Sequence, residues 1–179
     1  MRKPRGFTLT ELVIVVALVG ILAAVVIPLL QRAMIAANEA ETLGDIRTII
    51  DAQTGYSAVN GGFYDGNLGC LVFPAASDCI PNYPTSGPTF LDSQLAALTA
   101  RSGYNRLFTA AVLTPVPPTS SPTSIRDYRY DATPMTIGIT GVRGFAGQAD
   151  GRICFTPNGT PVPLGPAPGT LPQNCTNVP

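Results

Sequence analysis

The first third of the chain carries two successive patterns of apolar residues. From Leu12 to Leu30 the sequence holds nineteen residues without a charge. As an α-helix this run would be about 28 Å long, close to the thickness of the hydrocarbon core of a bilayer. The first pattern therefore predicts a helix that crosses a membrane.

Beyond Leu30 the apolar residues occupy a single helical face. They recur at intervals of three and four, at Ala36, Ala40, Leu43, Ile46 and Ile50, and the charged residues Arg32, Glu39, Glu41, Asp45 and Asp51 lie mostly between them. This spacing is typical of a helix packed on one side. Read without interruption, one helix runs from about Phe7 to about Thr54, and Gly55 offers a stop.

Two residues inside this helix weaken it. Pro28 removes a backbone donor and crowds the preceding turn, so we expect a kink there. Gly20 lowers helix stability by about 1 kcal/mol relative to alanine. Membrane helices tolerate both residues, so the pair by itself indicates little about function.

From Tyr56 onward the sequence is rich in turns and short strands. Its turn dipeptides are Asn60-Gly61, Asp65-Gly66, Asp150-Gly151 and Asn158-Gly159. We predict strands at 107–113, 125–132, 136–140 and 152–156, a short helix at 92–100, and a hairpin that joins 143–145 to 153–155 through Asp150-Gly151. Segments 115–124 and 157–179 are rich in Pro, Ser and Thr and are predicted to be loops.

Charge and composition exclude several classes of function. Arg2, Lys3 and Arg5 precede Gly6, and the rest of the chain holds no lysine and fewer arginines than acidic residues. Bulk charge therefore does not indicate nucleic-acid binding, while the basic start favours retention of that end in the cytoplasm. The chain has no histidine, so the usual bases that activate a nucleophile are missing and no enzyme is expected.

A carboxylate, Glu11, lies at the start of the apolar run, where a membrane-spanning helix does not require a charge. Glu11 opens the apolar run, and a charge costs roughly 2.5 to 3.5 kcal/mol at the centre of a bilayer and less near its edge. It is preceded by Met-Arg-Lys-Pro-Arg-Gly and then Phe7-Thr-Leu-Thr. This junction resembles that of the type IV filament family, the type IV pilins and secretion-system pseudopilins. Their precursors carry a short basic leader that ends in glycine, then phenylalanine, then a glutamate five residues into the mature chain.

The resemblance implies a processing site and an assembly residue. A prepilin peptidase would cut between Gly6 and Phe7 and methylate the new amine of Phe7, and Glu11 would act in assembly. In pilins the stretch that corresponds to Gly20–Pro28 bends or loses helical order in the fibre. A cleaved signal peptide or a lipoprotein fits less well, because no A-x-A triplet occurs in residues 1–60 and the first cysteine is Cys70.

The family likeness also implies an α+β fold. We expect a leader at 1–6, a transmembrane and assembly half of the helix at 7–30, an amphipathic half at 31–55, and an extracellular head at 56–179. The head would carry a small antiparallel sheet laid on the second half of the helix.

Four cysteines, Cys70, Cys79, Cys154 and Cys175, all lie beyond the apolar run. Three pairings are open, and pairing of neighbours gives Cys70–Cys79 and Cys154–Cys175. Pilin heads commonly carry a disulfide near the carboxyl end, which the second pair resembles. The absence of histidine and of any C-x-x-C pair argues against zinc, and the expected compartment is oxidising.

No cofactor is predicted, although calcium stays an open alternative. Some pseudopilins bind calcium in their carboxyl-terminal loops, and the candidates here are Asp65, Asp127, Asp131 and Asp150, without a calcium-loop spacing. Asp127 and Asp131 are more simply interpreted as solvated neighbours on one face of a strand.

These observations lead to one expected function and two alternatives. The expected function is a major or minor structural subunit of a type IV pilus, assembled from the bacterial inner membrane into an extracellular fibre. Its partners would be a prepilin peptidase, other pilin subunits, the inner-membrane assembly machinery and, before assembly, the lipid bilayer. The alternatives are a type II secretion pseudopilin and a non-polymerising, membrane-anchored binding domain.

Overall fold

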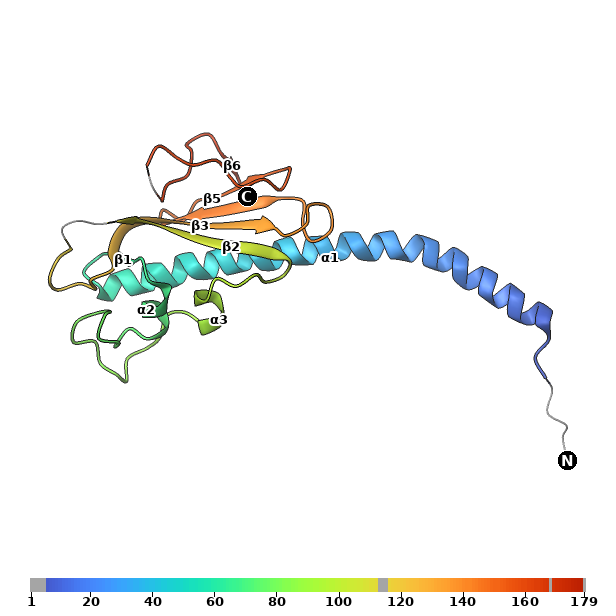
Figure 1. Ribbon diagram of the computed structural model, residues 1–179, viewed down its shortest axis with the longest axis horizontal. Helices are drawn as coiled ribbons and strands as arrows, with labels where there is room; N and C mark the ends of the chain where they lie inside the picture. Colours follow the sequence, from blue (N-terminus) through green and yellow to red (C-terminus); the bar gives the residue numbers. More distant parts are fainter. Residues whose placement is uncertain (1–5, 113–115, 168, 179) are drawn as a thin grey trace, which may run out of the picture.

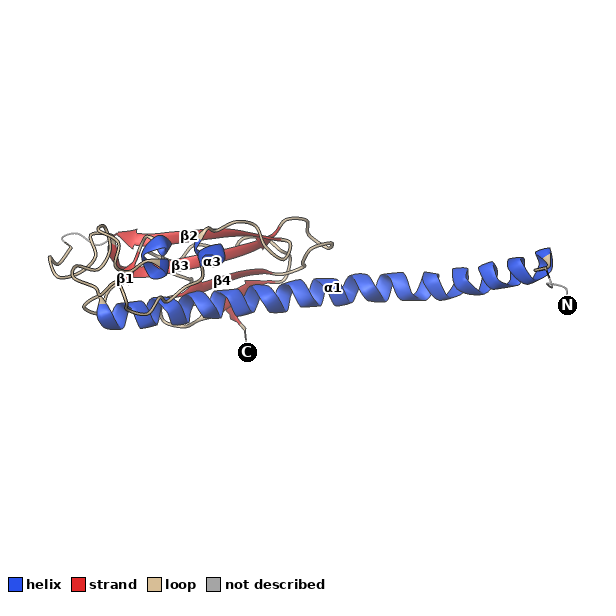
Figure 2. Ribbon diagram, turned by 90° about the horizontal axis from the view of Figure 1, so that it is seen from below, coloured by secondary structure: helices blue, strands red, loops and turns tan. Residues whose placement is uncertain are grey.

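A single helix runs the length of the molecule and carries the head on its second half. The computed structural model describes residues 6–112, 116–167 and 169–178. Helix α1 (Leu9–Val59) has 51 residues, about 76 Å at 1.5 Å per residue. Figure 1 shows its first half projecting alone, and Figure 2 shows its second half along one side of the strands. The α+β class is confirmed.

The head is built on an antiparallel sheet. The strands are β1 (Tyr64–Asp65), β2 (Tyr104–Val112), β3 (Ser124–Pro134), β4 (Gly144–Gln148), β5 (Ile153–Thr156) and β6 (Thr176–Asn177). They follow the order β1-β3-β4-β5-β6, with β2 also paired to β3. Two short helices, α2 (Leu68–Val72) and α3 (Ser93–Ala96), lie between β1 and β2 in the chain.

The two faces of the sheet are covered by different parts of the chain. On one face Ile46 and Ile49 of α1 join Tyr128, Tyr130 and other buried strand residues in the main core. On the other face a smaller cluster contains Ala146, Cys154, Val162 and Leu171, the last two from the tail. Within the segment predicted as a loop at 157–179, Val162 and Leu171 thus cover this face, and Thr176–Asn177 add the unpredicted strand β6 to the edge.

Helix α1 begins and ends later than the sequence predicts. It starts at Leu9 rather than Phe7, because Thr8 is the N-cap. It continues through Gly55 to Val59, so the predicted end near Thr54 is wrong. A Cβ at position 55 would lie 3.2 Å from the Phe90 ring, so this glycine provides close packing instead of a stop. Asn60 caps the helix, and Gly61 follows in the left-handed region at φ +67°.

The apolar half of α1 is helical throughout. Gly20 and Pro28 both lie inside the helix, which passes through them without a break. Figure 1 shows a gradual bend spread over the first half of the helix. The segment Gly20–Pro28 is thus helical in the single chain, and its loss of helical order in a fibre stays a prediction.

The buried face of α1 differs from the predicted one. Ala36 and Ala40 are exposed, whereas Glu39, Thr42 and Asp45 are buried. The charged residues were expected to lie between the packed positions. They are buried because arginines of the head pair with them, a contact that local periodicity does not reveal.

Most predicted strands are present, and one is wrong. β2, β3 and β5 lie close to the predicted strands, with Leu113 outside the described residues, and the β4–β5 hairpin turns at Gly151 (φ +85°) as expected. Segment 136–140 is instead a turn in which Thr140 N–H donates to the Thr136 carbonyl at 2.9 Å. Its alternating Ile137 and Ile139 imitate a strand, but both side chains are exposed. The helix predicted at 92–100 is shorter, and α2 and β1 were not predicted.

Close contact between α1 and β4 leads to a stability prediction. A Cβ on Gly147 would overlap Ile46 Cγ2, a branch methyl with little freedom to move. We expect Gly147→Ala to lower the free energy of unfolding by about 1 to 3 kcal/mol. Gly44→Ala is the matched control, since nothing lies within 4 Å of its Cβ, and it should raise stability by about 0.8 to 1 kcal/mol. Denaturant unfolding of the full chain in detergent measures both, and equal effects would contradict this packing.

Candidate functional site

The first half of α1 is an apolar surface without a partner among the residues that the structure describes. Its large side chains are strongly exposed, from Leu9 at 79% to Leu30 at 58%. In the described part of the chain, α1 is the one helix long and apolar enough to cross a membrane. No residue in its most apolar stretch is buried. Such a surface requires lipid or other protein around it.

The predicted cleavage junction precedes this helix. Gly6 and Phe7 lie outside regular structure, and Phe7 is 75% exposed. Apart from the chain neighbours of Gly6, no described atom lies within 4 Å of a Cβ placed on it. The Gly6–Phe7 peptide bond is therefore open to a second protein.

Glu11 makes its contacts within the first turn of α1. Its Oε2 accepts hydrogen bonds from Thr8 N–H at 2.9 Å and from the Thr8 hydroxyl at 2.7 Å. In return, Glu11 N–H donates to Thr8 Oγ1 at 3.2 Å. This reciprocal arrangement is a capping box, which satisfies backbone donors at a helix start.

Thr8 was not among the predicted site residues, although its spacing to Glu11 fits the capping-box pattern. The glutamate thus has a structural use inside its own chain. Both side-chain bonds go to Oε2, and Oε1 accepts no hydrogen bond from the residues that the structure describes.

Farther along α1, Glu39 binds the connection between β3 and β4 of the head. Its Oε1 accepts from the backbone N–H groups of Val142 and Arg143 at 2.9 and 3.0 Å, and its Oε2 lies 2.7 Å from the Arg143 guanidinium. The side chain of Asn38 donates to the Thr140 carbonyl at 2.9 Å. The connection between β3 and β4 is therefore held by two adjacent helix residues.

A second ion pair joins α1 to β2. The Arg106 guanidinium lies 2.8 Å from Asp45, and only 2% of the Arg106 side chain is exposed. At the surface next to it, Arg101 pairs with Glu41 at 3.1 Å. Because exposed pairs contribute little and a broken buried pair is costly, Asp45 and Arg106 matter more for the position of the head.

The Glu39 contacts predict a pH-dependent stability. Burial raises the pKa of the Glu39 carboxyl, but the Val142 and Arg143 N–H groups and the Arg143 guanidinium outweigh it and hold the pKa below its usual range. The stabilisation is fully present above the unfolded pKa and is lost as the pH falls through the lower folded pKa. We expect Glu39→Gln to cost about 1.5 to 3 kcal/mol at neutral pH.

Unfolding of the parent and the variant from pH 7 to pH 3 tests this expectation. The difference between them should shrink below the unfolded pKa, since protonated Glu39 then resembles glutamine. Glu41→Gln is the control, because its pair is exposed and should contribute less than about 1 kcal/mol. A Glu39→Gln difference independent of pH would contradict the charged role of Glu39.

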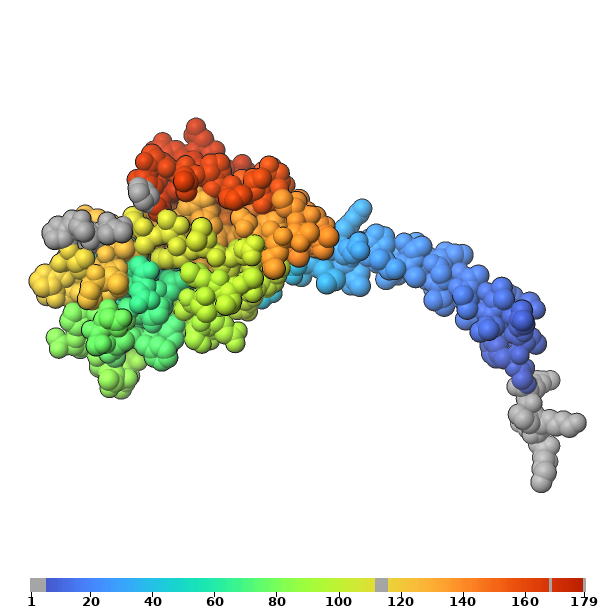
Figure 3. Space-filling view, viewed as in Figure 1, coloured from blue at the N-terminus to red at the C-terminus, as the bar shows by residue number. Residues whose placement is uncertain are grey.

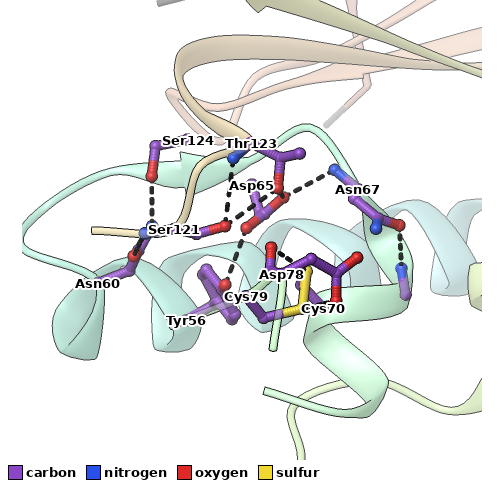
Figure 4. The surroundings of a disulfide bond; sticks show 11 residues. Tyr56, Asn60, Asp65, Asn67, Cys70, Asp78, Cys79, Ser121, Thr123 and Ser124 are labelled. Atoms are coloured by element: carbon purple, nitrogen blue, oxygen red, sulfur yellow. Dashed lines mark hydrogen bonds between the residues drawn. A yellow bond between two sulfur atoms is a disulfide. The ribbon is translucent and has the colours of Figure 1, made fainter. Parts of the chain in front are cut away.

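At the far end of α1, hydrogen bonds surround the first disulfide (Figure 4). Cys70 is bonded to Cys79, with Cα atoms 5.4 Å apart. Nearby, the buried Asp65 carboxylate accepts from the Tyr56 hydroxyl at 2.8 Å and the Thr123 hydroxyl at 2.6 Å. Burial and the Asp65 charge raise the pKa of Tyr56 well above its usual range, so the phenol stays a neutral donor. The end of α1 is thereby fixed to β1 and to the start of β3.

The second disulfide fastens the tail over the outer face of the sheet. Cys154 of β5 is bonded to Cys175, with Cα atoms 5.7 Å apart. On the same face the buried Arg129 donates from Nε to Asp131 at 2.8 Å and from its terminal nitrogens to the Val162 and Pro163 carbonyls. The expectation that Asp131 is solvated is therefore wrong, since it forms a buried ion pair. Burial raises the pKa of Asp131, and Arg129 opposes this shift.

The aspartates named for calcium lie in separate surroundings. Asp65 and Asp131 are engaged as described, Asp127 accepts from Gln148 at 3.3 Å, and Asp150 pairs with Arg152 at 2.6 Å. Within residues 6–112, 116–167 and 169–178, no three Asp, Glu, Cys or His side chains are grouped as a metal site would require.

Comparison with known proteins agrees with the junction and the long helix. Residues 1–27 match the family model described as the prokaryotic N-terminal methylation motif. The chain is 34% identical over 116 residues to the type IV major fimbrial protein FimA of Dichelobacter nodosus, covering 56% of this chain and 72% of that protein. It is 39% identical over 72 residues to the type IV wide pilus major component PilA4 of Thermus thermophilus, covering 40% and 54%. No solved structure gives a significant match.

The motif, the exposed apolar helix and the antiparallel head agree with these relatives. The FimA likeness extends well beyond the motif, over most of that protein's length. This chain belongs to the type IV pilin family of structural proteins.

Proposed function

We propose that the chain is a structural subunit of a type IV pilus. It is cut between Gly6 and Phe7 by a prepilin peptidase, methylated at the Phe7 amine, and polymerised through residues 7–30. Before assembly it is anchored in the bacterial inner membrane, and inner-membrane machinery then assembles it into an extracellular fibre. The observation that carries this proposal is an exposed apolar helix that begins with a carboxylate.

The cost of exposing apolar side chains to water leaves two environments for this helix, the lipid bilayer and the packed helices of other subunits. Burying one Val, Leu or Ile side chain contributes roughly 1.5 to 3 kcal/mol, so the exposed segment is incompatible with water. Lipid tails can surround its apolar side chains, but they provide no positively charged partner for Glu11. A second copy of the helix satisfies both, because it brings its own apolar surface and a positively charged amine.

The Phe7 amine is the proposed partner of Glu11. Cleavage after Gly6 creates this amine, which is charged at neutral pH. An amine from a neighbouring subunit can approach Oε1, which is free of the capping bonds. Pairing between chains would set how far each subunit is shifted along the fibre.

The relatives favour a pilus over a secretion pseudopilin. Both are named as major components of type IV fimbriae or pili. The two disulfides and the covered outer face of the sheet suit a head exposed outside the cell.

Expression in a bacterium that lacks its own major pilin but keeps the assembly machinery tests the proposal. Sheared surface material should contain fibres that antibodies against the head label along their whole length. The same cells without the prepilin peptidase are the control and should yield none. A chain found wholly in the inner membrane of peptidase-positive cells, with no fibres, would overturn the proposal in favour of a non-polymerising anchor.

A further inference from the structure

We propose that the connection between β3 and β4, residues 135–142, rests in the lipid headgroup layer while the subunit waits in the membrane. We call this segment the foot loop. The inference rests on the proposed membrane-anchored state of residues 7–30 and adds a second contact, between the head and the bilayer. Its partner is a phospholipid surface.

The foot loop is the part of the head nearest to the apolar half of α1. Figure 1 shows the β3–β4 connection, in orange, reaching along α1 towards its exposed half, and Figure 3 shows the same edge where the helix leaves the head. Gly138 and Ile139 of the foot loop line a hollow of about 250 Å³ together with Gln31 and Met34 of α1. The loop thus overlies the helix only one turn beyond Leu30.

Its apolar side chains are largely exposed. Met135 and Ile137 are each 57% exposed and Ile139 is 70% exposed. Asn38 and Glu39 hold the end of the loop to the helix through the backbone of Thr140 and Val142. No charged residue occurs from Thr133 to Val142. An uncharged, exposed apolar surface is therefore presented next to the membrane span.

The depth of this surface matches the headgroup layer. Met34 lies about 6 Å beyond Leu30, at 1.5 Å per helical residue. The interfacial region on each side of the hydrocarbon core is roughly 5 to 7 Å thick. If Leu30 marks the end of the core, Ile139 lies within that layer.

Charge at this level also suits phospholipids. Arg32 is exposed on α1 between Leu30 and Met34, where a guanidinium can reach lipid phosphates. No acidic residue occurs between Leu12 and Asn38, and the nearby Glu39 is paired with Arg143. Neither the helix from Leu12 to Asn38 nor the foot loop carries an acidic group that would repel an anionic surface.

The size of the patch favours lipid over another protein. A stable protein interface buries about 800 Å² on each partner, more than three side chains supply. A bilayer contact needs less area, because the adjacent span already holds the chain at the surface and no new association is required. Continuity with the span therefore assigns the foot loop to the bilayer.

The chain contains no tryptophan, so single substitutions give clean fluorescent reporters. Full-length Ile139→Trp is reconstituted into vesicles of phosphatidylcholine and phosphatidylglycerol, with and without lipids brominated at defined depths. Leu18→Trp reports the middle of the span. Phe73→Trp reports the far end of the head, since Phe73 is 68% exposed and follows α2 near Tyr56, about 33 Å along α1 from Met34.

We expect Ile139→Trp emission to shift to shorter wavelength and to be quenched most by bromine near the lipid ester groups. Leu18→Trp should be quenched by deep bromine, and Phe73→Trp by aqueous iodide alone. If Leu18→Trp is quenched and Ile139→Trp behaves like Phe73→Trp, the foot loop is free of lipid and this inference is wrong. If Leu18→Trp is not quenched either, the membrane anchor itself fails. A blue shift of Ile139→Trp that depends on protein density, without bromine quenching, would assign the surface to a second copy and overturn the lipid contact.

Discussion

The Glu11→Ala subunit is expected to be processed and inserted normally and yet to form few or no fibres. In the proposed function, processing depends on the exposed Gly6–Phe7 bond and insertion depends on the apolar helix, so neither requires this carboxylate. Assembly does require it if each Phe7 amine must find a carboxylate in an apolar surrounding. A Phe7 amine left without its carboxylate in an apolar surrounding costs about 3 to 5 kcal/mol.

Glu11 also caps its own helix, so the two roles must be separated. Loss of a cap costs about 0.5 to 2 kcal/mol, less than an unpaired buried charge. Glu11→Gln keeps the capping box, because glutamine serves at this position as glutamate does, but it removes the charge. Thr8→Ala does the reverse, since it removes the hydroxyl that donates to Glu11 and keeps the charge.

Fibre yield in sheared fractions, with the processed chain in the membrane as the reference, distinguishes these roles. We expect Glu11→Gln to resemble Glu11→Ala and Thr8→Ala to retain most of the yield. Glu11→Asp should recover part of the yield if its shorter side chain still reaches the amine. Parental yield from Glu11→Gln, with loss in Thr8→Ala, would show that capping and not charge is the reason for Glu11.

Gly6→Val is expected to block cleavage and leave the whole precursor in the membrane. Glycine lets a backbone enter a tight peptidase site, and a branched side chain at this position obstructs it. If fibres require the Phe7 amine, as proposed, loss of cleavage also removes the fibres. Intact mass of the membrane-extracted chain measures the outcome directly.

Gly20→Val is the matched control for processing. This control places the same substitution inside the exposed helix, where a Cβ added to Gly20 meets no atom within 4 Å outside the adjacent helix backbone. Its precursor should be cut at the parental rate. Efficient cleavage of Gly6→Val would mean that the peptidase reads the junction through other residues.

The sequence predicts the features of this fold that depend on local pattern. An unbroken apolar run and a three-to-four periodicity specify the long helix, and Asp150-Gly151 specifies the β4–β5 turn. The short elements β1, α2 and β6 are missed, because two to five residues carry no period. Segment 136–140 shows the opposite error, since alternating isoleucines indicate a strand and here form an exposed loop.

In the candidate site, too, contiguous residues could be predicted from the sequence, whereas contacts between distant residues could not. The junction at Gly6, Phe7 and Glu11 is contiguous, so it can be identified from sequence, and Thr8 could have been added from its spacing to Glu11. The contacts of Glu39 with Arg143 and of Asp45 with Arg106 join residues far apart in the chain. A charge on a helix is ordinarily assigned to solvent, and only the fold shows that these two face the head.

A helical reconstruction of sheared fibres by electron cryomicroscopy tests the central claim most directly. We predict that residues 7–30 of many copies fill the fibre axis, that the heads form the surface, and that density begins at Phe7 near Glu11 of a neighbouring subunit. The same map shows whether Gly20–Pro28 stays helical in the fibre. An axis built from heads, or subunits that retain residues 1–6, would contradict the account.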